Sequence, residues 1–111
     1  TELNASGSAP IYACRAWVNF NGTGTVAIRA SGNVSSITDN GTGNYTVNFM
    51  DAMPDANFSI SGSIGSGSTA RGLIVNSNYN GENLTTRIRI LVNNTGFAAE
   101  DKEYINLSIF R

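Results

Sequence analysis

The sequence contains no histidine, which excludes the Ser-His and Cys-His arrangements of nucleophilic catalysis and most zinc sites. Its single cysteine, Cys14, excludes a disulfide within the chain, so stability has to come from packing. No apolar run approaches the roughly 20 residues of a membrane-spanning helix, and no signal peptide is visible. We therefore expect neither histidine-dependent catalysis nor membrane insertion.

Charge is also scarce in this chain. Charged residues make up 14% of it, against about 25% in average soluble domains, and the formal net charge is -1. The seven basic residues are scattered singly, so the sequence shows no electrostatic footprint for nucleic acid or an acidic membrane surface. Asn, Ser, Thr and Gly are abundant instead, and such uncharged polar groups favour burial between subunits or extracellular exposure.

Carboxylates and glycine-rich stretches are the remaining candidates for chemistry. The candidate carboxylates all fall in predicted turns, where Asp caps backbone amides and charges stay solvated. They are Asp39, Asp51, Asp55, Glu82, Glu100, Asp101 and Glu103. The spacing from Asp51 to Asp55 lacks the dense oxygen donors of a calcium loop, and no G-x-x-x-x-G-K-[ST] phosphate loop is present. We therefore expect that the chain is not an enzyme and that it binds no metal and no cofactor.

Apolar and polar residues alternate along most of the chain, and this pattern predicts short strands. In residues 11–20 one face is apolar from Tyr12 to Phe20, and Cys14 on that face is expected to be a packed small residue. Further strands are expected at residues 26–30, 34–38, 45–49, 58–62, 73–75, 83–93 and 104–111. Within the last two, the residues expected to face inward are Ile88, Ile90, Val92, Ile105, Leu107 and Ile109, with Arg87 and Arg89 outside.

This pattern predicts an all-β fold of about seven or eight short antiparallel strands, without a convincing helix. We expect a jelly-roll-like β-sandwich over residues 11–111, preceded by a linker at residues 1–10. Residues 31–33 are either a turn or a bulge in a longer strand. The wide apolar faces and few charges favour packing of one sheet against a neighbouring copy.

Three aromatic residues are able to stack on sugar rings. Trp17 lies within the first expected strand, and we expect it to pack in a core or a subunit interface. Tyr79 is better placed for recognition, because it sits in an amide-rich loop. With other loop residues it forms the expected receptor-binding set: Tyr79, Asn78, Asn80, Phe97, Asn40 and Thr42.

The run ACRAWVNFNGTGTVAIRASGNVSSITDNGTGNYTVNF, followed by AMPDANFSISGS, resembles a recurrent segment in C-terminal regions of bacteriophage tail fibre proteins, especially those of marine and environmental phages. The resemblance covers about half of the chain. It implies a distal, homotrimeric fibre domain of the virion that adsorbs to the host cell surface, outside the cell. Residues 1–10 would then be a linker or the end of a preceding fibre segment, leading to other virion proteins.

The expected ligand of such a domain is a host cell-surface glycan, because aromatic, amide and hydroxyl groups suit sugars, with a surface protein as the alternative. A different role for the same sandwich is a capsid decoration or head-fibre domain used for structural attachment. The outer tip depends on residues 31–33. A turn there places the loops at Asn21, Asp39, Gly65 and Phe97 away from the N-terminal tether, whereas a bulge places Met53 and Tyr79 there with Asn21.

Overall fold

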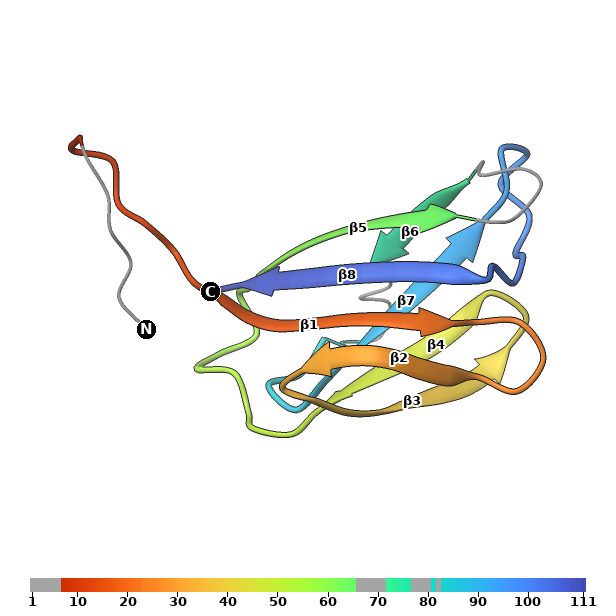
Figure 1. The fold of residues 1–111 in the computed structure, drawn as a ribbon, viewed down its shortest axis with the longest axis horizontal. Helices are drawn as coiled ribbons and strands as arrows, with labels where there is room; N and C mark the ends of the chain where they lie inside the picture. The colour runs from red at the N-terminus through yellow and green to blue at the C-terminus, as the bar shows by residue number, and fades with distance from the viewer. Residues whose placement is uncertain (1–6, 66–71, 77–80, 82) are drawn as a thin grey trace.

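The computed structural model describes residues 7–65, 72–76, 81 and 83–111, and this part of the chain contains eight strands and no helix. The strands form two four-stranded antiparallel sheets that face each other (Figure 1). In chain order they are β1 Cys14–Asn21, β2 Ala27–Gly32, β3 Val34–Gly41, β4 Asn44–Phe49, β5 Ser59–Gly65, β6 Leu73–Asn76, β7 Arg87–Asn93 and β8 Tyr104–Phe110. The prediction of an all-β antiparallel sandwich is confirmed.

Strands distant in sequence lie side by side in both sheets. The first sheet has the order β2-β1-β8-β5 and the second the order β3-β4-β7-β6. The pairs β1 with β8, β5 with β8 and β4 with β7 therefore join separate parts of the chain. Non-local pairing of this kind slows folding, because long loops must close before the strands can pair.

The core lies between the two sheets and uses every second residue of β1, β4, β7 and β8. Its members in these strands are Ala16, Val18, Phe20, Tyr45, Val47, Phe49, Ile88, Ile90, Val92, Ile105, Leu107 and Ile109. All six residues expected to face inward in β7 and β8 do so. Burial of each large aliphatic side chain contributes about 1.5–3 kcal/mol, and the wide apolar faces of the two sheets cover each other.

The chain crosses from the first sheet to the second through a tight turn at Asn33. Strand β2 ends at Gly32 and β3 begins at Val34, with a positive φ of 56° at Asn33 between them. The Asn33 side chain holds this left-handed conformation, since its Oδ1 accepts from the Asp51 N–H at 2.7 Å and its Nδ2 donates to the Asp51 carbonyl at 3.0 Å. The chain therefore turns at Asn33, directly after Ser31 and Gly32 at the end of β2, and residues 31–33 are not a bulge in one longer strand.

The beginning of β1 differs from the prediction. The strand starts at Cys14, and its pairing with β8 shifts register between Cys14 and Ala16. Because of this irregularity, inward alternation begins only at Ala16, while Tyr12 is 71% exposed and Cys14 is also exposed. The expectation that Cys14 is a packed core residue is wrong.

Three loops meet at the end of the sandwich opposite the start of β1 and the end of β8, which we call the distal end (Figure 1). The hydroxyl of Tyr45 lies 2.7 Å from the Gly22 carbonyl oxygen and 2.6 Å from Oδ1 of Asp101. The same Oδ1 accepts from the Gly43 N–H at 2.8 Å. These four residues, here called the distal latch, connect the β1–β2, β3–β4 and β7–β8 loops.

The latch depends on a buried tyrosine that keeps its proton. Burial, and then the hydrogen bond to Asp101, raise the pKa of Tyr45 well above its usual range. The hydroxyl carries one proton and donates to one of its two oxygen partners at a time. Gly43 fits this site because its φ is +61° and a Cβ there would meet the backbone of Val92 and Glu100.

We expect Tyr45→Phe to lower the free energy of unfolding by about 1–3 kcal/mol, because the change removes the hydrogen bond of a buried hydroxyl to the Gly22 carbonyl or Asp101 while keeping the ring. Urea unfolding measures this. The matched control is Tyr104→Phe, which removes a hydroxyl from a residue that is 44% exposed and should change stability by less than about 0.5 kcal/mol. Equal stability of the two variants would contradict the role of the latch.

An ion pair fastens the other end of the sandwich. Nε and Nη2 of Arg111 donate to the two carboxylate oxygens of Asp55 at 2.8 and 2.7 Å. These bonds, and next the Asn57 backbone N–H, lower the pKa of Asp55 from its ordinary 3.8 to about 2. The pair links the segment between β4 and β5 to the residue that follows β8.

The lowered pKa makes stability depend on pH in the acid range. The stabilisation by Asp55 is fully present above its unfolded pKa of 3.8 and is lost as the pH falls toward its folded pKa of about 2. We expect the melting temperature of the wild type to fall more between pH 5 and pH 2 than that of Asp55→Asn. Asp51→Asn serves as the control, and it should keep the wild-type pH profile.

Candidate functional site

The structure brings three of the expected receptor-binding residues to the distal end. Asn40 and Thr42 lie at the β3–β4 turn, and Phe97 lies in the β7–β8 loop with 75% of its surface exposed. A φ of 64° turns the chain at Phe97, whose N–H donates to the Asn94 carbonyl at 3.0 Å. Residues 78–80, which hold the other three, lie outside the described residues.

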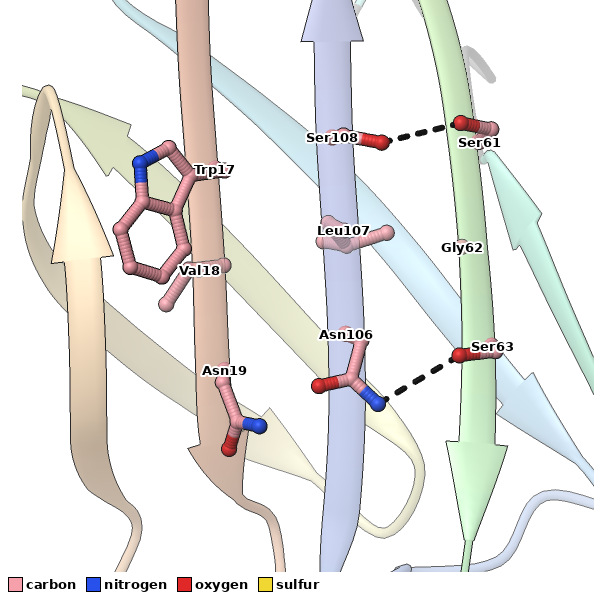
Figure 2. Close-up of a pocket in the computed structure, with 9 residues that line it drawn as sticks. All are labelled: Trp17, Val18, Asn19, Ser61, Gly62, Ser63, Asn106, Leu107 and Ser108. Atoms are coloured by element: carbon pink, nitrogen blue, oxygen red, sulfur yellow. Dashed lines mark hydrogen bonds between the residues drawn. The ribbon is translucent and has the colours of Figure 1, made fainter.

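A groove of about 510 Å³ runs over the outer face of the first sheet, away from the distal loops. It is lined by Trp17, Val18, Asn19, Ser61, Gly62, Ser63, Asn106, Leu107 and Ser108 (Figure 2). Val18 and Leu107 turn their side chains into the core, so backbone forms the floor beside them. The remaining side chains present an indole, amides and hydroxyls. We call this the Trp17 groove.

Sheet register sets the order of the polar groups in the Trp17 groove. Trp17 pairs with Ser108, which pairs with Ser61, and these three form one row across β1, β8 and β5. The next row consists of Asn19, Asn106 and Ser63. Directly paired residues of antiparallel strands project from the same face, so both rows point away from the core.

Hydrogen bonds hold several of these side chains in place. The Ser61 and Ser108 hydroxyls lie 3.0 Å apart, and Nδ2 of Asn106 donates to the Ser63 hydroxyl at 3.4 Å (Figure 2). Toward the distal end, Arg29 donates to Oδ1 of Asn19 at 3.3 Å. The groove therefore has a polar wall in which several side chains are held by hydrogen bonds.

Trp17 occupies the opposite side of the groove from the Ser61–Ser108 and Asn106–Ser63 hydrogen bonds. Its indole extends from β1 toward β2 (Figure 2) and lies against Gly32, where a Cβ would clash with the indole nitrogen. The side chain is 43% exposed, so the part of our expectation that placed Trp17 in a core is wrong. The reason is the alternation itself, which puts Trp17 on the face opposite Ala16 and Val18.

A second groove, of about 280 Å³, lies on the outer face of the second sheet. Asn40 contributes to it from β3, and Arg87 and Arg89 contribute from β7. Both arginines project outward, as the sequence predicted. Asn40 therefore lies on the outer face of the second sheet and also close to the β3–β4 turn.

Four of the side-chain carboxylates that the structure describes have structural partners, and one of these is Asp55 in its pair with Arg111. Asp39 accepts from the Gly41 N–H at 3.0 Å, Glu100 pairs with Lys102 at 3.0 Å, and Asp101 belongs to the distal latch. In the described part of the chain, no group of three or more His, Cys, Asp or Glu side chains is placed to hold a metal ion. No helix there is long and apolar enough to cross a membrane.

Comparison with known proteins found no matching family model, no matching curated protein and no matching solved structure. The resemblance to tail fibre segments therefore rests on the residues quoted for it.

Proposed function

We propose that this chain is the distal domain of a bacteriophage tail fibre and adsorbs to the host cell by binding a surface glycan in the Trp17 groove. The observation that carries the proposal is an exposed indole beside two rows of outward amides and hydroxyls. The fibre assignment itself comes from the sequence resemblance. The groove supplies the chemistry that such a domain requires.

Sugars fit the Trp17 groove for two physical reasons. The apolar C–H face of a sugar ring packs against an aromatic ring, and its hydroxyls pair with amides and serine hydroxyls. The groove volume of about 510 Å³ lies within the range of about 300–1,000 Å³ that small ligands occupy. None of its lining residues is charged, which favours a neutral sugar there.

Assembly would strengthen a shallow site of this kind. The resemblance implies a homotrimer, which would carry three copies of the Trp17 groove. When several weak sites engage one surface together, avidity exceeds the single-site affinity by about 10²–10⁴. Both described ends of the chain lie opposite the distal end (Figure 1), so a tether on the N-terminal side leaves the groove accessible along the outer sheet.

We expect Trp17→Ala to weaken binding to neutral surface polysaccharides by about tenfold, since the loss of an aromatic contact of about 1.4 kcal/mol corresponds to that factor. Trp17 is the only tryptophan of the chain, so its fluorescence reports ligand entry directly. Trp17→Phe should keep part of the affinity. Phe97→Ala, at the distal end, should bind like the wild type.

Adsorption of the labelled protein to a panel of bacterial cells, with its solution mass from light scattering, tests the fibre assignment. A trimer that binds cells and loses binding with Trp17→Ala is the expected result. Binding to phage capsids but not to cells would favour the decoration role instead. Loss of adsorption in Phe97→Ala but not in Trp17→Ala would move the site to the distal loops.

A further inference from the structure

The second groove differs in charge from the Trp17 groove. It lies over β3, β4 and β7 on the opposite side of the sandwich, and its lining residues are Thr38, Asn40, Thr46, Asn48, Arg87 and Arg89. Two of these six are arginines, and none of the described lining residues is a carboxylate. We call this the arginine groove.

The register of the second sheet places the two arginines on one face with polar partners. Arg89 pairs with Thr46, which pairs with Thr38 in the edge strand. Arg87 pairs with Asn48. The arginines are two residues apart in β7, so their Cα atoms are separated by about 7 Å along the strand.

Hydrogen bonds order the floor of the arginine groove. Nε of Arg89 donates to Oδ1 of Asn44 at 2.8 Å, which directs that side chain along the sheet. Nδ2 of Asn40 donates to the Thr46 hydroxyl at 2.8 Å. Nδ2 of Asn48 donates to the Thr38 hydroxyl at 3.0 Å.

These bonds leave the groove rich in donors. A threonine hydroxyl that accepts an amide N–H still has its own proton to donate. Among the hydrogen bonds of the described residues, none uses the protons of Thr38 or Thr46. Arg87 is exposed and adds the planar guanidinium donors that match the oxygens of a carboxylate or sulfate.

We propose that the arginine groove binds the oxyanion of an acidic sugar, a carboxylate or sulfate carried by a polysaccharide. The guanidinium of Arg87 and the two threonine hydroxyls bind the oxyanion, and the adjacent amides bind ring hydroxyls. Nucleic acid is disfavoured because the remaining basic residues are scattered and the net charge is -1. This site lies on the other sheet from the Trp17 groove, so it stands independently of the proposed function.

The test measures binding of the intact protein to alginate, dextran sulfate and neutral dextran at low ionic strength, where exposed charges are least screened. Alginate carries carboxylates, dextran sulfate carries sulfates, and dextran carries neither. We expect binding to at least one acidic polymer, with Arg87→Gln weakening it by about tenfold or more, as expected for lost charge-assisted hydrogen bonds. Arg87→Lys keeps the charge without the planar guanidinium and should restore only part of the affinity.

Matched controls separate specific binding in the arginine groove from general electrostatic attraction of the protein to an acidic polymer. Arg15→Gln makes the same charge change on the first sheet and should leave binding near the wild-type value. Binding of neutral polysaccharide to Trp17→Ala is measured separately, so failure of either proposal is seen on its own. Competition by sodium sulfate, compared with sodium chloride at equal ionic strength, shows whether a free anion suffices or the sugar is needed.

Several results would overturn the proposal. These are no binding to either acidic polymer, equal weakening by Arg87→Gln and Arg15→Gln, or equal binding of neutral dextran through Arg87. A change in solution mass with Arg87→Gln would also overturn it, because the groove would then be an interface between copies. Circular dichroism confirms that the exposed substitution leaves the variant folded.

Discussion

Each sheet buries one face only, and this constraint determines both the core and the outer surfaces. Side chains alternate along a strand, so the register that brings Ile105, Leu107 and Ile109 together inside also aligns Asn106 and Ser108 outside. A slip of one residue would exchange the two faces. The Trp17 and arginine grooves are therefore consequences of the same strand pairing that forms the hydrophobic core.

Strand β8 and the distal latch connect the two sheets. Strand β8 lies between β1 and β5, so the first sheet and the Trp17 groove are complete only when the last strand is in place. Asp101, just before β8, then joins the latch with Tyr45 of the second sheet. The arrangement fixes the distal loops relative to both sheets, while the outward faces stay open to solvent.

The sequence predicted the features that depend on the alternation of apolar and polar residues and on the residue types in turns. The inward residues of β7 and β8 followed from period two. The same period puts Trp17 on the outward face with Arg15 and Asn19, and the expectation of a core went against it. The failure at Cys14 arose from a register irregularity, which depends on its distant partner β8. To predict the two grooves, one must know that β8 lies beside β5 and that β4 lies beside β7. Such pairing of distant strands cannot be predicted from the local sequence. The role of Asp101 was hidden for the same reason, because its partner is Tyr45.

The direction of the strands also bears on mechanical load. Strand β1 begins at the end that holds the N-terminal segment and runs beside β8 beneath the Trp17 groove (Figure 1). If a sugar binds in the groove as proposed, a pull between it and that segment acts along the strands. The hydrogen bonds between β1 and β8 then share the force together in shear and do not open one after another. The sandwich is thus oriented to resist detachment along its long axis better than peeling from its side.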